Sequence, residues 1–332
     1  MATTTALVTG VAGQDGVLLA RRLLADGHRV VGTRLPGPLP ALAPYLAGVE
    51  LREHDIRDAA GFERLLVTDE PDEIYNLAGF TSVGASWDHR ALVEQVNATA
   101  VEQMLQALVA WRDRTGREPR FFEASSSEVF GPAAANPQRE DAAHDPQNPY
   151  AESKSRAHAL TVRAREVHGL FASVGILYNH ESPLRDSRFV TRKITRAAAE
   201  IAAGTRESLT LGNLDVSRDW GAADDYVLAM QAALQHDEPG DFIIATGRLH
   251  SLKELLELAF AAAGVVDPWA YVQQDEALLR TADAPGLTGD PGKAQRELGW
   301  AAVTSFEDLV AEMVRVDLER LRSGVEESPD YV

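Results

Sequence analysis

The sequence contains no cysteine among its 332 residues. Disulfide bonds, thiolate nucleophiles and cysteine-ligated zinc or iron–sulfur sites are therefore excluded. Basic residues are also scarce, because 32 Lys and Arg stand against 50 Asp and Glu, which gives a formal net charge of −18. Since neutralising phosphates needs a basic surface, we expect no nucleic-acid partner. A few arginines lining a pocket could still bind a small anionic ligand.

Long apolar runs are missing as well. No segment approaches the roughly 18 consecutive apolar residues that a membrane span needs. The amino-terminal MATTTALVTG has no basic region followed by a long apolar stretch. We therefore expect a soluble, cytoplasmic enzyme with no membrane partner. The hydrophobic content of 45% is ample for one large domain or two unequal lobes.

Short apolar runs alternate with helical patterns in the first half of the chain. Strands are expected at 6–10, 28–34, 49–55, 72–79 and 120–127, with helices at 17–27 and 91–113. This alternation predicts an α/β fold, a Rossmann-type doubly wound parallel sheet that binds its ligands at the carboxyl ends of the strands.

Helical patterns dominate after about residue 180. They cover 189–203, 223–236, 251–263 and 304–322, and short strand candidates lie at 208–212 and 242–247. These patterns predict a smaller mixed α/β lobe. We expect a cofactor domain over 1–178, a mainly substrate-binding lobe over 179–325 from which some segments return to the first domain, and a frayed polar tail over 326–332.

A glycine-rich turn follows the first expected strand. TGVAGQDG places Gly10, Gly13 and Gly16 three residues apart before a helix. Glycine at these positions allows a tight turn and close approach of the backbone to a pyrophosphate, which then faces the free N–H groups of the helix. The spacing is typical of short-chain dehydrogenases, although a glycine-rich loop alone also fits a turn with no ligand.

The cofactor preference depends on the end of the second strand. Arg34 lies there, and VVGTRLPG contains no acidic residue. A cation suits the 2′-phosphate of NADP, whereas an acid would bind the 2′-hydroxyl of NAD, so NADP is favoured over NAD. An exposed arginine at a strand end is nevertheless common. Further cofactor contacts are expected after the third and fourth strands, from Asp55, Ile56, Leu77, Ala78 and Gly79.

Tyr150 and Lys154 lie four residues apart in the helical pattern NPYAESKSRAHALTV, so their side chains share one face. A lysine ammonium and a cationic nicotinamide ring near a phenol would stabilise its phenolate form and make it a base. The spacing also arises by chance on helices. After a fifth strand that ends in hydroxyls, it indicates a proton-transfer pair.

That fifth strand ends in ASSSEVFG. Ser126 is expected to hydrogen-bond the reacting sugar oxygen, and Glu128 returns to the same face if the segment stays extended. Oxidising carbon 4 of a sugar acidifies the hydrogen on carbon 5, which a carboxylate can then remove before water leaves from carbon 6. Epimerases and simple reductases need no such base. The alternative is a surface glutamate that opens a loop.

With these motifs the chain resembles the extended short-chain dehydrogenases, and within them the GDP-mannose 4,6-dehydratases. The similarity runs through TGVAGQDG, SSSE at 125–128, YNHESPLRDSRFVTRKI at 178–194, NLDVSRDWGAADDYV at 213–227 and GDPGKAQRELGW at 289–300. It implies conversion of GDP-mannose to GDP-4-keto-6-deoxymannose, by hydride transfer from carbon 4 to carbon 6 with loss of water. NADP would be the cofactor, and no metal is expected.

The resemblance also implies roles for individual residues. Ser126 would polarise the carbon 4 oxygen, Tyr150 would be the base for its proton, and Glu128 would be the base at carbon 5. The cofactor would also be contacted by Gln14, Asp15, His180 and Arg185. The nucleotide sugar would be bound by Ser127, Asn179, Val190, Lys193, Arg218 and Arg280.

One departure concerns the loop after the second strand. The family usually has a longer, basic loop whose paired arginines help to bind NADP and to build a tetramer, whereas TRLPGPLPALAP is shorter and rich in proline. We therefore expect a homodimer through the long helices, with a tetramer as the alternative. The rival functions are a UDP-glucuronate decarboxylase, a 4-epimerase, a 4-keto reductase and a non-catalytic cofactor-sensing protein, which generally loses the tyrosine–lysine pair.

Overall fold

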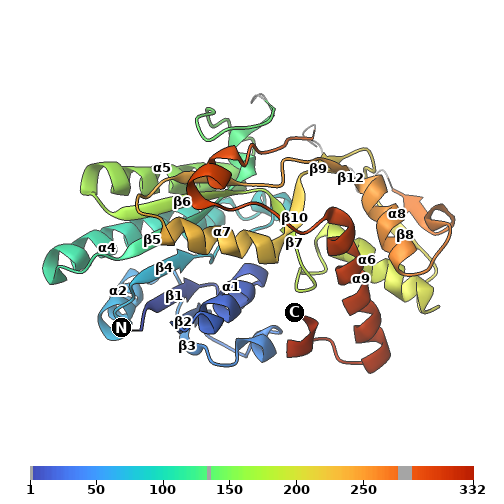
Figure 1. The fold of residues 1–332 in the computed structure, drawn as a ribbon, viewed down its shortest axis with the longest axis horizontal. Coiled ribbons are helices and arrows are strands. Elements are labelled where there is room, and N and C mark those ends of the chain that lie inside the picture. The colour runs from blue at the N-terminus through green and yellow to red at the C-terminus, as the bar shows by residue number, and fades with distance from the viewer. Residues whose placement is uncertain (1–2, 133–135, 276–285) are drawn as a thin grey trace.

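A computed structural model of the chain describes residues 3–132, 136–275 and 286–332 (Figure 1). Its centre is a seven-stranded sheet in which every neighbouring pair is parallel. The strands in spatial order are β11 (Asp241–Ile244), β6 (Phe171–Leu177), β5 (Arg120–Ser126), β4 (Glu73–Asn76), β1 (Thr5–Thr9), β2 (Arg29–Arg34) and β3 (Glu50–Glu53). The predicted doubly wound α/β fold is confirmed.

Helices cover both faces of this sheet, which is why its central strands are apolar on both sides. One core contains α1 (Gln14–Ala25) and α7 (Ala223–Gln235). The core on the other face contains α2 (Ala59–Asp69), α4 (Ala100–Thr115) and α5 (Pro149–His168). Before α4 the chain forms α3 (Arg90–Glu94) and the π-helical turn η3 (Gln95–Thr99).

Two strands extend the five that the sequence predicts. β6 lies beside β5, and β11 pairs with β6, so that Phe242 lies opposite Gly175. The strand expected at 242–247 is one of the segments that return to the first domain, because α7 carries the chain back over the sheet and delivers β11 to its edge. Parallel pairing joins segments that are distant in sequence, and a local apolar pattern does not reveal it.

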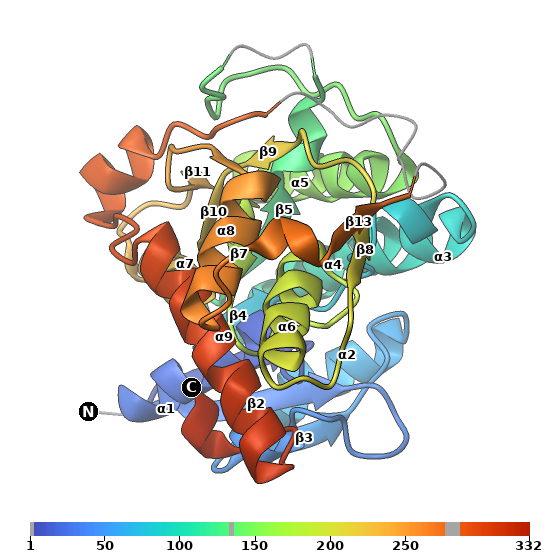
Figure 2. The same cartoon turned by 90° about the vertical axis from the view of Figure 1, so that its right-hand side faces the viewer.

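The second lobe is built around α6 (Val190–Ala202), α8 (Leu252–Ala262) and α9 (Phe306–Ser323), which share one apolar core. Figure 2 looks onto this lobe, with the three helices in front of the sheet. Three short strand pairs and the 3₁₀ and π turns complete the described chain: β7 (Asn179–Glu181) with β10 (Trp220–Ala222), β9 (Ser217–Arg218) with β12 (His250–Ser251), β8 (Leu209–Leu211) with β13 (Val272–Gln274), η1 (Ala43–Leu46), η2 (Gly84–Ser86), η4 (Ser127–Phe130), η5 (Pro268–Ala270), η7 (Ala294–Leu298) and η8 (Pro329–Tyr331).

The expectation of a frayed tail at 326–332 is wrong. Tyr331 is only 5% exposed, and the Tyr45 hydroxyl donates to Glu327 Oε2 at 2.8 Å. Arg21 of α1 donates to the carbonyl of Val332 at 2.6 Å. The tail therefore packs against the cofactor domain, in contacts that bridge about 300 positions of sequence and that its polar composition does not reveal.

Candidate active site

The glycine turn has the geometry that its sequence predicts. Gly10 has a φ of +67°, and a Cβ built on it would lie 2.8 Å from the backbone of Ala78 at the end of β4. A Cβ on Gly16 would lie 2.5 Å from the carbonyl oxygen of Gly10. Gly13 caps α1 without a side-chain hydrogen bond. The first N–H groups of the helix are thus left for an anion, so the turn fits a dinucleotide pyrophosphate.

Two side chains of this turn bind the segment after β6. Gln14 donates to the His180 carbonyl at 3.1 Å and accepts from the Ser182 hydroxyl at 2.9 Å. His180 Nε2 lies 2.9 Å from Asp15 Oδ2, and its Nδ1 lies 2.7 Å from the carbonyl of Tyr178. Burial opposes charge on both partners, but their mutual attraction raises the pKa of His180 and lowers that of Asp15. The expected cofactor residue His180 therefore anchors the turn.

Arg34 lies at the end of β2, where the NADP prediction places a cation. Its Nη2 donates to Glu53 Oε1 at 2.8 Å, and its Nη1 donates to the carbonyls of Leu35 and Gly37. The acid that β2 lacks is supplied by β3, because the register places Glu53 opposite Arg34. Sequence reasoning missed Glu53, since only the pairing of two strands brings it to this position.

The cofactor contacts expected just after β3 differ in exposure. Ile56 is 6% exposed and belongs to the core beneath the sheet. Asp55 accepts a hydrogen bond from Arg57 Nε at 2.9 Å, and this pairing lowers the pKa of Asp55. Asp55 therefore remains a charged acceptor at the edge where the cofactor is expected.

Tyr150 and Lys154 lie in the first turns of α5. Asn148 caps the helix, Pro149 is its first residue, and Tyr150 follows directly. Lys154 is 6% exposed, and its Nζ donates to the carbonyl of Ala124 at 2.7 Å. Lys154 is thus held near the carboxyl end of β5, one turn after Tyr150 on the same helix.

A buried carboxylate that sequence reasoning missed lies beside Lys154. Glu123 is fully buried within β5, with Oε1 3.7 Å from Lys154 Nζ. Its Oε2 accepts from Asn76 Nδ2 at 2.7 Å, and Asn76 Oδ1 accepts from the Thr9 hydroxyl at 2.8 Å. Burial raises the pKa of Glu123, while Lys154 opposes that shift. The available signal was a glutamate in the otherwise apolar RFFEAS, because a buried charge needs a partner.

The chain after β4 is held close to Lys154. The N–H groups of Leu77 and Ala78 donate to the Thr9 hydroxyl at 3.1 Å. A Cβ on Gly79 would lie 3.2 Å from Asn97 Oδ1 and 3.7 Å from Lys154 Nζ. Of the residues expected to contact the cofactor here, Gly79 therefore lies near Lys154, while Leu77 and Ala78 are held at the end of β1 by Thr9.

Asn97 is a third residue that the sequence did not reveal. Its Oδ1 accepts from Phe80 N at 2.8 Å, and its Nδ2 donates to the Phe80 carbonyl and to the Ser153 hydroxyl. It lies in the π-helical turn η3, a distortion that is frequent at functional sites. The single helix expected over 91–113 is interrupted at this turn, and Asn97 links the loop after β4 to α5.

The backbone from Ser126 to Glu128 is not extended, so the expectation that Glu128 lies on the same face of an extended segment as Ser126 is wrong. β5 ends at Ser126, and the 3₁₀ turn η4 begins at Ser127, with the Ser126 hydroxyl accepting from Glu128 N at 3.3 Å. The Glu128 carboxylate instead accepts from Asn148 Nδ2 at 3.1 Å. Glu128 is therefore held at the amino end of the helix that carries Tyr150.

The expected substrate residues lie in the second lobe and beside it. β7 and β10 pair so that Asn179 lies opposite Trp220, which joins two of the quoted motifs. Lys193 Nζ donates to the Thr210 carbonyl at 2.8 Å, and burial lowers the pKa of this lysine. The remaining positions are Ser127 in η4, Val190 at the start of α6 and Arg218 in β9.

Arg185, which the resemblance assigns to the cofactor, is held by neighbouring side chains. Its Nε lies 3.0 Å from Glu181 Oε2, and its guanidinium stacks 3.6 Å above the centre of the Phe189 ring. These two contacts fix the orientation of the Arg185 side chain, which lies in the segment between β7 and α6. Arg280 lies outside the described residues.

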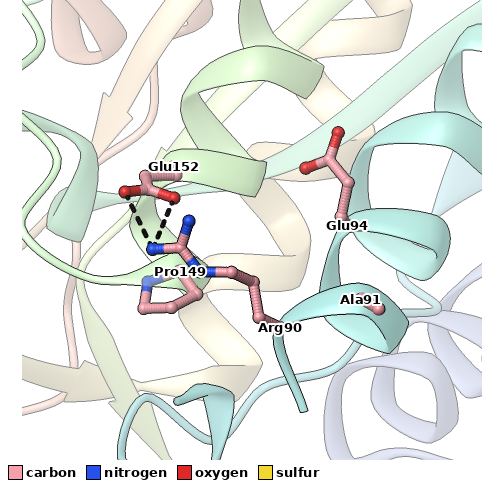
Figure 3. Close-up of a pocket in the computed structure, with 5 residues that line it drawn as sticks. All are labelled: Arg90, Ala91, Glu94, Pro149 and Glu152. Atoms are coloured by element: carbon pink, nitrogen blue, oxygen red, sulfur yellow. Dashed lines mark hydrogen bonds and ion pairs between the residues drawn. The ribbon is translucent and has the colours of Figure 1, made fainter. Parts of the chain in front are cut away.

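Two surface hollows border α5. One of about 450 Å³ lies between α3 and α5, where Arg90 pairs with Glu152 at 3.3 Å (Figure 3). The other, of about 380 Å³, lies between α4 and α5. None of the expected site residues lines either of these two hollows. Within 3–132, 136–275 and 286–332, no group of three or more His, Asp or Glu side chains could hold a metal ion.

The all-parallel sheet and the glycine turn before α1 define a Rossmann-type fold of the short-chain dehydrogenase/reductase class. Residues 7–313 match the family model described as GDP-mannose 4,6 dehydratase. The chain belongs to the GDP-mannose 4,6-dehydratase family.

Curated relatives from distant organisms agree. GDP-mannose 4,6 dehydratase 2 of Arabidopsis thaliana is 41% identical over 95% of this chain and 87% of its own length. The human GDP-mannose 4,6 dehydratase is 36% identical over 96% of this chain and 92% of its own. Family membership therefore rests on nearly the whole chain.

Solved structures give the same fold. RMD from Pseudomonas aeruginosa, complexed with NADPH, has a TM-score of 0.79 and 25% identity, covering 96% of this chain and 98% of its own. DesIV from Streptomyces venezuelae, a dTDP-glucose 4,6-dehydratase with NAD bound, has a TM-score of 0.83 over 97% and 98% of the two chains. At 23% identity, the second likeness shows the fold alone.

Proposed function

We propose that this chain is a hydro-lyase that converts GDP-mannose to GDP-4-keto-6-deoxymannose with loss of water. The observation that carries the proposal is the Glu128 carboxylate held by Asn148 at the start of the Tyr150 helix. A base beside the reacting sugar is needed to remove a proton from carbon 5, and neither a 4-epimerase nor a 4-keto reductase needs one. The intact tyrosine–lysine pair argues against a non-catalytic sensor.

The chain's own residues divide the chemistry between them. Ser126 would hydrogen-bond the carbon 4 oxygen while Tyr150 takes the hydroxyl proton, with the Lys154 ammonium stabilising the phenolate. A bound nicotinamide ring would take the hydride from carbon 4 and return it to carbon 6. Glu128 would remove the carbon 5 proton and pass it to the carbon 6 hydroxyl, which would leave as water. Carbon 5 would take up a proton from solvent when the hydride returns to carbon 6. Lys193 and Arg218 are proposed to bind the diphosphate, for which ammonium and guanidinium groups are suited.

An isotope experiment tests this function. GDP-mannose carrying deuterium at carbon 4 is expected to give a product with the label at carbon 6, because the hydride is taken and returned within one active site. Mass spectrometry with fragmentation of the sugar locates the label. Loss of the deuterium to solvent, or its retention at carbon 4, would contradict the proposal.

For the cofactor we propose NADP rather than NAD, with Arg34 as the group that binds the 2′-phosphate. Glu53 weakens this preference for NADP, because its Oε1 accepts a hydrogen bond from Arg34 Nη2 at 2.8 Å. A phosphate at this place would have to compete with the carboxylate for the guanidinium. The shortened loop after β2 supplies no second arginine, so the preference depends on this single pair.

Substitutions at the pair test the cofactor proposal. Glu53→Gln is expected to raise the preference for NADPH over NADH about two- to fivefold, as expected for loss of an exposed ion pair. Arg34→Gln is expected to lower it about ten- to a hundredfold, through loss of charge-assisted hydrogen bonds. Fluorescence titration gives both dissociation constants. Glu50→Gln is the control, since Glu50 lies at the other end of β3 and pairs with Arg29. An unchanged preference in the Arg34 variant would contradict the assignment.

We propose a homodimer through α4 and α5. The hollow between these helices is lined by the buried Leu105 and by the partly exposed Val109 and Leu160, beside the polar side chains of Glu102 and Arg163. Apolar side chains on paired long helices suit helix-to-helix packing between two copies. Sedimentation analysis of the purified protein measures the assembly, and a monomer would contradict this proposal.

A further inference from the structure

Asn148 uses the two ends of its amide for two different contacts. Oδ1 accepts from the backbone N–H of Ala151 at 2.9 Å, which caps α5, and Nδ2 donates to Glu128 Oε2 at 3.1 Å. The chemistry settles the orientation of the amide, because only an oxygen accepts from an N–H and only an NH₂ donates to a carboxylate. The side chain is 8% exposed, so water competes weakly for either contact.

We propose that Asn148 is the positioning residue for Glu128 and couples that carboxylate to Tyr150, so that the two bases act on neighbouring carbons of one sugar. This inference rests on the proposed function. Glu128 and Asn148 are 20 positions apart, and local chain geometry does not relate them. Tyr150, by contrast, lies two residues after Asn148 in the same helix, so the amide sets the place of Glu128 relative to that helix.

The surrounding backbone holds both partners in place. The N–H of Asp145 donates to the carbonyl of Val129 at 2.9 Å, which joins the two ends of the intervening segment. Gly131 has a φ of +65°, and a Cβ built on it would lie 2.1 Å from the Asp145 carbonyl oxygen, so the backbone at Gly131 packs directly against the backbone at Asp145. The Ser126 hydroxyl fixes the backbone of Glu128. These contacts fix the backbone but not the side chain of Glu128. Among the residues that the structure describes, Asn148 is the one that hydrogen-bonds the Glu128 carboxylate.

Two substitutions separate the two contacts. Asp and Ser cap helices about as well as Asn, so Asn148→Asp and Asn148→Ser should both keep α5 intact. The Asp variant replaces the donor with a like charge, whereas the Ser variant shortens the side chain beyond reach of Glu128. Asn148→Ala removes the cap as well and serves as the reference for a purely structural defect, which is expected to appear as a lower Tm.

The experiment follows carbon 4 oxidation and dehydration separately, using the near-ultraviolet absorbance of the reduced nicotinamide and mass spectrometry of the product. The wild type is expected to dehydrate GDP-mannose without accumulating reduced cofactor. In Asn148→Asp and Asn148→Ser we expect an unchanged Tm, oxidation within about threefold of wild type, dehydration slowed about a hundredfold, and accumulation of the reduced cofactor, because a displaced base costs about that factor.

Three outcomes would overturn an assignment. Normal dehydration in both variants would remove Asn148 from the positioning of Glu128. An equal loss of oxidation and dehydration would show that Asn148 acts on the helix as a whole, which also overturns the inference. A wild-type protein that binds cofactor but does not dehydrate GDP-mannose would overturn the proposed function itself, and the role of Asn148 in it.

Discussion

Replacing Glu128 with Gln is expected to lower the rate of dehydration by about 10²- to 10⁴-fold, the usual contribution of a general base. The amide has nearly the shape of the carboxylate but does not take up the carbon 5 proton. Oxidation at carbon 4 should persist, since it depends on Tyr150 and Lys154. The variant should therefore hold reduced cofactor and a 4-keto sugar that still carries its carbon 6 hydroxyl, which absorbance and mass spectrometry detect.

A matched control is available on α5. Glu152→Gln makes the same chemical change two residues after Tyr150, but Glu152 faces Arg90 of α3 (Figure 3). Its dehydration rate should equal that of the wild type. If Glu128→Gln dehydrated GDP-mannose as fast as this control, Glu128 would have no part in the elimination.

Replacing Tyr150 with Phe is expected to stop the reaction one step earlier. Loss of the phenol removes the base for the carbon 4 hydroxyl proton, so we expect carbon 4 oxidation to fall by about 10²- to 10⁴-fold. No reduced cofactor should build up, in contrast to the Glu128 variant. Stopped-flow absorbance after mixing with GDP-mannose makes the comparison.

The control for this variant is Tyr271→Phe. Tyr271 lies in the second lobe, with its ring centre 6.3 Å from that of Phe260, and it should be replaced without effect on oxidation. Cofactor binding should be retained in both variants, because the glycine turn is untouched. Rapid accumulation of reduced cofactor in Tyr150→Phe would show that another group is the base.

Together the two variants place the bases in order. The structure gives the reason to expect two separable steps, because Glu128 and Tyr150 belong to different elements, the 3₁₀ turn η4 and helix α5. Lys154 is tied to the Ala124 carbonyl and lies near Glu123, so it is oriented independently of Glu128. Damage to one base should therefore leave the other in position.

The sequence by itself determined the features that repeat over short distances. The strand–helix alternation, the glycine turn before α1 and the four-residue spacing of Tyr150 and Lys154 are local patterns, and each was predicted correctly as structure. Position 10 requires glycine because its φ is positive and because the backbone of Ala78 lies too close for a Cβ. Both features follow from one tight turn. Such features need no knowledge of distant partners.

The tertiary structure decided everything that depends on which segments meet. It placed β6 and β11 in the central sheet and brought Glu53 into contact with Arg34. It also brought His180 into contact with Asp15 and packed the carboxyl-terminal tail against α1. Side-chain pairs of this kind arise from strand order and register, which link positions up to about 300 apart, and no local period encodes them. The contact of Asn148 with Glu128 is of the same kind: the sequence supplied both residues, and only the fold put the donor beside the carboxylate.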